Sequence, residues 1–229
     1  MAEVLSQQQI DALLGQLQSG NVDFQDIEEQ SLANKVKEYD FMSPKKFTRE
    51  QLKLLNNIFD SFARFFSLHL SSMLRVSCQA EILQVEEEEY KEFNNALNDS
   101  VLVAIMNMNN EEYKIDSKQI LLEMSRPISF FVLDRLLGGK GSINVIERDY
   151  TEIEIAIFEY LFKQIAIILK NAWVNYMELE HTLDAIETNS RLLQIIQAEE
   201  AVAIIVMEIN IDDVKGNMNI CVPYSALED

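Results

Sequence analysis

The feature that most constrains this chain is an internal repeat. Phe47-Thr48 is followed by Gln51-Leu52, and Tyr150-Thr151 by Glu154-Ile155, an offset of 103 residues. Each pattern combines a capping box with a hydrophobic staple and predicts the start of a helix. Apolar residues at helical spacing follow both starts and coincide through five steps at this offset: Leu52, Leu55, Phe59, Phe62, Phe66 and Leu70 in the first, Ile155, Phe158, Phe162, Ile165 and Leu169 in the second.

The segments after each long helix repeat as well. An alternating strand pattern comes first, at Val76 to Ile82 and around Leu183 to Ala185. Hairpins should follow, from 101–108 to 120–124 in the first copy and from 203–211 to 218–222 in the second, closed there by a loop at 212–216. Pro127 and Pro223 then each begin a helix. We therefore predict an α+β domain with pseudo-twofold symmetry, an antiparallel or mixed sheet on one side and long amphipathic helices on the other.

A further helix start lies at the extreme N-terminus. Ser6 and Gln9 form a capping box with Leu5 and Ile10 as the staple, and an apolar stripe continues through Leu13, Leu14 and Leu17. A helix of roughly a dozen residues is marginal alone in water, so we expect it to fold when a partner groove receives the stripe. Packing onto its own domain fits the pattern equally well. A membrane-surface helix fits less well, because the first basic residue is Lys35.

The charge balance excludes some classes of partner. The 229 residues include 38 acidic and 19 basic side chains, a net charge of -19. Nucleic acid binding depends on neutralising phosphates and is not expected. No apolar run approaches the roughly 20 residues that cross a bilayer, so we expect a soluble chain that reaches membranes through partners. Cys78 and Cys221 lie in strand-like segments and are expected as buried, reduced thiols, which fits a cytoplasmic protein.

The N-terminal segment resembles a known family. Ser-Gln-x-x-Ile-Asp-Ala-Leu-Leu, here Ser6 to Leu14, is similar to the N-terminal motif of the flagellar motor switch family FliM, which binds phosphorylated CheY. The resemblance implies a CheY-binding peptide at 1–18, a flexible linker at 19–42 and, at 43–229, a middle domain similar to the CheC/CheX phosphatases. A smaller C-terminal domain related to FliN would follow and is missing here. The implied CheY-binding residues are Leu5, Ser6, Gln7, Ile10, Asp11, Ala12, Leu13, Leu14 and Leu17.

A glycine cluster follows the apolar segment Ile128 to Leu137. Three glycines in four residues exceed what a helix C-cap needs. By resemblance this is the Gly-Gly-x-Gly motif of the FliM middle domain, which contacts the middle domain of FliG. A loop without side chains lets a partner backbone approach closely. The implied FliG-binding residues are Leu133, Leu136, Leu137, Gly138, Gly139, Lys140 and Gly141.

An enzyme is the alternative, since CheC-like relatives hydrolyse an aspartyl phosphate with a Glu and an Asn three residues later on each long helix. Neither long helix has an Asn at that spacing. The residues three positions after Glu50, Glu152, Glu154 and Glu159 are Lys53, Ile155, Ile157 and Phe162. We therefore expect no catalytic residues, metal or cofactor. His69 and His181 lie in unrelated segments, the run Glu86 to Glu89 indicates a solvated face or loop, and the glycine cluster lacks the spacing of a P-loop.

These expectations describe a FliM-like scaffold of the rotor ring rather than an enzyme. Its middle domain would bind FliG and neighbouring FliM copies, while the tethered peptide captures phosphorylated CheY and so controls the direction of rotation in chemotaxis. Contact with FliN would need the missing C-terminal domain. The chain would be cytoplasmic, at the inner face of the cell membrane through its partners. A CheC-like CheY phosphatase is the alternative.

Overall fold

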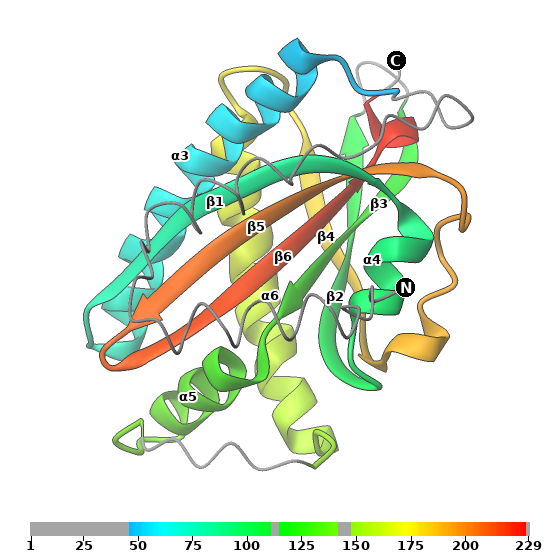
Figure 1. The fold of residues 1–229 in the computed structure, drawn as a ribbon. Coiled ribbons are helices and arrows are strands. Elements are labelled where there is room, and N and C mark those ends of the chain that lie inside the picture. Colours follow the sequence, from blue (N-terminus) through cyan, green and yellow to red (C-terminus); the bar gives the residue numbers. More distant parts are fainter. Residues whose placement is uncertain (1–45, 111–114, 142–147, 228–229) are drawn as a thin grey trace, which may run out of the picture. The chain divides into compact units, whose positions relative to one another are not determined.

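Figure 1 shows the fold in a computed structural model, which describes residues 46–110, 115–141 and 148–227. The chain divides into two units, Met1–Pro44 and Lys45–Asp229. The predicted N-terminal helix and linker lie outside the described residues, so the boundaries at 18 and 42 stay predictions. In the part that the structure describes, no helix has the length and hydropathy of a membrane span.

The described residues form a six-stranded antiparallel sheet with two long helices, α3 and α6, along one of its faces (Figure 1). The helices are α3 (Arg49–Leu74), α4 (Tyr90–Ala96), α5 (Arg126–Leu136) and α6 (Glu152–Trp173), with 3-10 turns η1 (Ser190–Leu192) and η2 (Tyr224–Ala226). The strands are β1 (Cys78–Glu89), β2 (Ser100–Asn110), β3 (Ile115–Met124), β4 (Glu180–Asn189), β5 (Ala201–Ile211) and β6 (Val214–Pro223). The predicted α+β class is confirmed.

The strand order confirms the repeat. The order in the sheet is β1-β5-β6-β3-β2-β4. The first copy supplies β1, β2 and β3, and the second supplies the equivalent strands β4, β5 and β6. Replacing every strand by its equivalent gives the same order read in reverse. A pseudo-twofold axis therefore passes between β3 and β6. The register obeys the same symmetry. Cys78 pairs with Ile211, and His181 pairs with Met108. His181 follows Cys78 by 103 residues, and Ile211 follows Met108 by 103 residues, so the two pairs are equivalent. Each copy's first strand thus pairs with the hairpin of the other copy.

α3 and α6 begin at the predicted capping boxes. The Thr48 hydroxyl accepts the N–H of Gln51 at 3.1 Å while the Gln51 side chain accepts the N–H of Thr48 at 2.8 Å, and Thr151 with Glu154 repeats the arrangement. The predicted apolar stripes face the sheet and are fully buried at Phe59, Phe62 and Phe66 of α3 and at Phe158, Phe162 and Ile165 of α6. At about 1.5–3 kcal/mol for each such side chain, this burial is what holds the helices on the sheet.

The opposite face of the sheet is covered at one end by α4 and the segment around η1. Tyr90 and Phe93 of α4 pack with Leu193 over Val103 and Ile204 of the sheet. The Tyr90 hydroxyl donates to the carbonyl of Leu193 at 2.7 Å, which ties the two covering segments together. Sequence reasoning missed α4, because its seven residues carry too few apolar positions to reveal a helical period.

Two local features differ in part from the prediction. The expected loop 212–216 is a two-residue turn, since Ile211 pairs with Val214 and Asp212 takes the left-handed conformation at φ 55°. The run Glu86 to Glu89, expected on a solvated face or loop, lies in β1 opposite residues 201–204 of β5, and each of its residues is half-buried. An edge strand accommodates these carboxylates because one side of its backbone pairs while its side chains still reach solvent.

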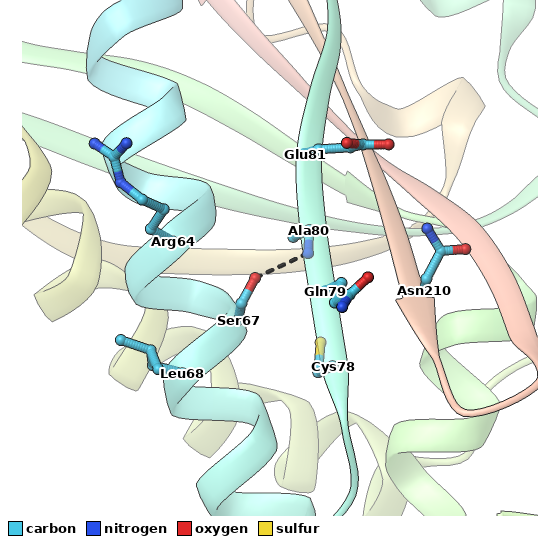
Figure 2. Close-up of a pocket in the computed structure, with 8 residues that line it drawn as sticks. All are labelled: Arg64, Ser67, Leu68, Cys78, Gln79, Ala80, Glu81 and Asn210. Carbon is cyan, nitrogen blue, oxygen red and sulfur yellow. Dashed lines mark hydrogen bonds between the residues drawn. The ribbon is translucent and has the colours of Figure 1, made fainter.

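α3 closes part of the free edge of β1 (Figure 2). Ser67 Oγ accepts the N–H of Ala80 at 2.8 Å, and Ser71 Oγ accepts that of Cys78 at 3.0 Å. Unpaired edge groups are a template for pairing with other chains, and these hydroxyls satisfy two of them. An open groove of about 510 Å³ lies along this seam, lined by Arg64, Ser67, Leu68, Cys78, Gln79, Ala80, Glu81 and Asn210.

Glu123 and Asn219 meet on the pseudo-twofold axis. Glu123 of β3 pairs with Asn219 of β6. On the other side Glu123 pairs with Val103, and Asn219 pairs with Val206. Val103 and Val206 are 103 residues apart and equivalent, so Glu123 and Asn219 are equivalent too and lie on the axis. Asn219 Nδ2 donates to Glu123 Oε2 at 2.7 Å. Burial raises the pKa of Glu123 to about 7, against the opposing effect of this hydrogen bond. The centre of the sheet therefore holds a carboxyl that is partly protonated at neutral pH.

We expect Glu123→Gln to stabilise the domain at alkaline pH. The pKa of Glu123 is about 7 in the folded chain, against roughly 4.3 when exposed. The wild type therefore loses stability as the pH rises from about 4.3 through 7. Gln keeps an oxygen for Asn219 without the buried charge. In denaturant unfolding, the variant should gain about 1–3 kcal/mol on the wild type between pH 4.5 and 8.

The control for this measurement is Glu81→Gln, at an exposed position of β1. It should leave the pH dependence of unfolding unchanged. A Glu123→Gln difference that is the same at every pH would show that Glu123 does not titrate as described.

Candidate partner-binding site at the glycine loop

The glycine loop follows α5, which the core holds in place. Pro127 lies in the first turn, where a missing N–H costs no helical hydrogen bond. Ile128, Phe131 and Val132 are buried among the sheet and the long helices. Gly138 then takes a φ of 90°, where the left-handed turn favours glycine and ends the helix. The loop therefore projects from an anchored support.

The structure places the three predicted leucines at different depths. Leu133 is buried in the core at 4% exposure, Leu136 is half-buried against it, and Leu137 is 66% exposed. Leu133 therefore supports the loop from inside and offers no surface, which corrects its predicted role as a contact. It lies within α5 next to the buried Phe131 and Val132, whereas Leu137 is the residue that ends the helix. Gly138 and Lys140 are exposed as well. We name Leu137, Gly138 and Lys140 the exposed loop face.

The packing of the chain itself favours glycine at 141 and, less strictly, at 139, where a side chain would have to displace the Asp134 carboxylate. A Cβ at Gly139 would lie 2.3 Å from Asp134 Oδ1, and one at Gly141 would lie 2.4 Å from Phe131 Cε2. Gly141 also has a φ of 80°, which L side chains rarely adopt. At Gly138 a Cβ would meet nothing within 4 Å. Two of the three glycines thus have an internal cause that the sequence interpretation did not include.

Two charged residues that sequence reasoning missed hold the loop. The Asp134 carboxylate accepts the N–H of Gly141 at 2.7 Å, and its carbonyl accepts that of Gly139 at 2.8 Å. Arg135 donates to the Gly139 carbonyl at 3.2 Å and to the Leu74 carbonyl at 2.7 and 3.2 Å. The sequence did contain a signal for this role, since an acidic and a basic residue stand about one helical turn before the glycines. Backbone geometry at the loop is therefore set before any partner arrives.

An arginine and aromatic cluster lies where the chain returns from the loop toward α6. Phe130 stacks on Tyr150 at 5.2 Å between ring centroids, and the guanidinium of Arg148 lies 5.2 Å from the Phe130 ring. The hydroxyls of Ser129 and Tyr150 are 2.6 Å apart. Arg126 adds a second cation near both rings. This cluster fixes the start of α6 against α5.

The helix starts lack the geometry of a phosphatase. Both carboxylate oxygens of Glu154 accept from Arg148, at 2.7 and 2.5 Å, and one accepts from the N–H of Thr151. The hydrogen bonds from Arg148, which outweigh desolvation, lower the pKa of Glu154 to about 2. Glu50 is exposed in the first turn of α3, with Lys53 three residues on. Neither Glu50 nor Glu154 has the Asn side chain three residues later that the phosphatase arrangement uses to position water.

Other residues capable of chemistry serve packing. Cys78 and Cys221 are buried and free, as predicted, and burial raises the pKa of Cys78 to about 11. His181 is buried beside Trp173, and desolvation lowers its pKa to about 4. Across the described ranges no group of three or more His, Cys, Asp or Glu side chains is placed to hold a metal. The predicted CheY-binding residues lie outside those ranges.

The sequence matches curated relatives along nearly all of its length. The family profile described as "Flagellar motor switch protein FliM" matches residues 48–229. FliM of Treponema pallidum is 32% identical over 228 residues, which cover 100% of this chain and 65% of that protein. FliM of Bacillus subtilis is 30% identical over 226 residues, covering 99% and 67%. The chain thus spans about two thirds of the length of these relatives.

Solved structures share the fold. The FliM middle domain from H. pylori gives a TM-score of 0.71 at 29% identity, covering 80% of this chain and 97% of that one. A chain of the FliG–FliM complex from H. pylori gives 0.73 at 32% identity, covering 80% and 100%. FliY from Thermotoga maritima gives 0.70 at 14% identity over 80% and 95%, which is a likeness of fold alone. By the family match over most of its length, this chain belongs to the FliM family of flagellar motor switch proteins.

Proposed function

We propose that this chain is a component of the flagellar switch ring and binds FliG through the exposed loop face, Leu137, Gly138 and Lys140. The observation that carries the proposal is a loop whose backbone Asp134 and Arg135 hold in place while one large apolar side chain points to solvent. The similar chain in the FliG–FliM complex from H. pylori supports the choice of partner.

The loop backbone is preorganised for binding. A loop whose backbone is already held in place loses less conformational freedom on binding than a mobile one. Leu137 offers the apolar area, and the open space around Gly138 lets a partner backbone approach. Lys140 adds a positive charge to a strongly acidic chain, so an acidic group on the partner would meet it at the rim.

We further propose that the N-terminal segment captures phosphorylated CheY with the residues assigned above from Leu5 to Leu17. The capping box, the staple and the apolar stripe are all local to this segment, which supports a peptide that binds as a helix. A flexible tether over the expected linker 19–42 would have a root-mean-square span of roughly 27 Å. The captured regulator would stay near the domain at a high effective concentration, and its occupancy would bias the direction of rotation.

Neighbouring copies in the ring are proposed to meet the outer face of α6. Apolar residues recur there at seven-residue spacing and are 75, 60, 55 and 54% exposed: Ile153, Tyr160, Ile167 and Val174. This spacing keeps a row on one side of a helix, and an exposed apolar row is a common mark of an interface. We name these four residues the α6 row.

A second apolar surface supports a head-to-tail contact. Phe65 and Leu68 of α3 are 44 and 70% exposed, and Leu68 also lines the groove of Figure 2. α3 packs on β1 and α6 packs on β4, the two opposite edges of the sheet. A heterologous ring needs two different surfaces on opposite sides of each subunit. The α6 row of one copy and the α3 surface of the next meet that requirement.

The ring assignment gives the chain its proposed location and remaining partners. It would lie in the cytoplasm at the inner face of the cell membrane and be held there by other motor proteins. FliN would be met by the part of the longer relatives that this chain does not span. A CheC-like phosphatase remains the alternative, and the engagement of Glu154 by Arg148 argues against it.

We expect Leu137→Asp to weaken binding of the FliG middle domain at least tenfold, because it replaces the apolar anchor by a charge. Titration calorimetry measures this directly. The matched control is Leu192→Asp, at a position that is 63% exposed on η1. Neither change should shift thermal melting, since both side chains are at the surface. Equal affinities for the two variants would contradict the site. Valine at Gly139 or Gly141 is unsuitable as a test, because it would clash inside the chain.

The peptide Met1 to Gly20 should bind CheY that carries a phosphoryl mimic. Ile10→Ala with Leu14→Ala should remove most of the affinity, since each fully buried side chain contributes about 1.5–3 kcal/mol. Gln8→Ala, on the opposite side of the expected helix, should bind like the original peptide. Fluorescence anisotropy measures all three peptides. An unchanged affinity in the double variant would rule out docking through the stripe.

Ile167→Glu should weaken self-association of the chain at least tenfold, since it places a charge in the α6 row. Sedimentation velocity over a concentration series measures the effect, with Leu192→Glu as the surface control. Melting of the monomer should stay the same for both. Self-association that responds equally to both changes would place the ring contact elsewhere.

A further inference from the structure

Arg135 joins two backbone segments that are far apart in the chain. Its guanidinium donates from Nη2 and Nε to the Leu74 carbonyl, at 2.7 and 3.2 Å, and from Nη1 to the Gly139 carbonyl, at 3.2 Å. Leu74 is the last residue of α3, and Gly139 is in the middle of the glycine loop. One side chain therefore bridges the end of the longest helix and the proposed FliG site.

The bridge satisfies a need of α3. The last carbonyls of a helix lack intrahelical partners, and the C-terminal end of the helix dipole favours a cation. α3 has no basic residue in its last turn, and Arg75 ends it in the left-handed conformation at φ 55°. Leu74 itself is 3% exposed, although its neighbour Arg75 is exposed. Arg135 supplies the missing charge and the missing donors from outside the helix.

The bridge also constrains the loop. A guanidinium presents its donors in a rigid planar fork, so the two carbonyls cannot separate without losing hydrogen bonds. The loop has a second attachment through the Asp134 carboxylate to the Gly141 N–H at 2.7 Å, but that contact stays within α5 and the loop. Among the hydrogen bonds that hold the loop, those of Arg135 are the ones that also reach α3.

We propose that Arg135 is a positioning residue that couples binding at the exposed loop face to the order of the C-terminal end of α3. The proposal rests on the proposed FliG site. A partner bound to the loop restricts the remaining fluctuations of the Gly139 carbonyl. Because the Arg135 guanidinium joins that carbonyl to the Leu74 carbonyl, the end of α3 is restricted as well. The coupling is reciprocal, so a shift of α3 changes the affinity of the loop by the same factor. α3 carries the exposed Phe65 and Leu68, so a contact on that side would reach the loop by this route.

The test uses the full chain with Arg135→Lys, which keeps the charge but cannot bridge both carbonyls, and Arg75→Lys as the matched control at an exposed neighbour. Hydrogen exchange in the free chain is read at residues 70–76 and 137–141. Arg135→Lys should exchange at least fivefold faster in both segments, and Arg75→Lys should match the wild type. In calorimetry, affinity for the FliG middle domain should fall about tenfold in Arg135→Lys alone.

The bound state gives the decisive measurement. Binding of FliG to the wild type should slow exchange at 70–76, and Arg135→Lys should abolish that slowing while the partner still binds at saturating concentration. Asp134→Asn serves as the second variant and is the one used if Arg135→Lys fails to fold. It should loosen Gly141 but leave the slowing at 70–76 intact. Slowing that persists in Arg135→Lys, or disappears in Asp134→Asn, would overturn the role of Arg135.

The outcomes also separate this proposal from the FliG site itself. If Leu137→Asp does not affect FliG binding, the proposed site is wrong, whereas the free-chain exchange still reports whether Arg135 connects the loop to α3. If Leu137→Asp weakens binding and exchange in free Arg135→Lys equals that of the wild type, the site stands and the coupling is wrong.

Discussion

The pairing of each copy's first strand with the other copy's hairpin determines where the rest of the molecule lies. β1 follows α3 directly and pairs with β5, so α3 lies over strands of both halves and its C-terminal end comes close to α5. β4 follows α6 in the same way and pairs with β2. The contact between Arg135 and Leu74 exists because this exchange brings α5 and the end of α3 together. The candidate site is thus a product of the whole topology.

The glycine loop shows how one motif can satisfy two demands. Gly141 is favoured by the Phe131 ring and its positive φ, and a side chain at Gly139 would have to displace the Asp134 carboxylate. Gly138 has no such neighbour and stands beside the exposed Leu137. Internal packing therefore shapes the loop, and the shaped loop presents a small surface. A glycine motif of this kind does not by itself identify a contact, because the same residues would be needed without any partner.

Sequence patterns predicted the elements whose cause is local. Both capping boxes, the two long helices, the paired hairpins and the buried cysteines follow from spacing within a few residues, and the structure confirms them. The exchange of strands, the carboxyl of Glu123 on the axis and the reach of Arg135 to Leu74 depend on residues brought together from distant segments. Periodicity also could not separate the buried Leu133 from the exposed Leu137, since both lie on one apolar helix end.

The strand exchange bears on how the chain is made. Cys78 of β1 pairs with Ile211 of β5, so a ribosome that adds about 5–20 residues per second leaves β1 without its neighbour for roughly ten seconds. A strand that waits with an unpaired edge can pair with other chains. Ser67 and Ser71 can engage the first part of β1 as soon as α3 has formed, and the carboxylates of Glu86 to Glu89 act as gatekeepers on the rest. The charge of this edge would therefore oppose pairing of β1 with other chains until its partner strand has been made.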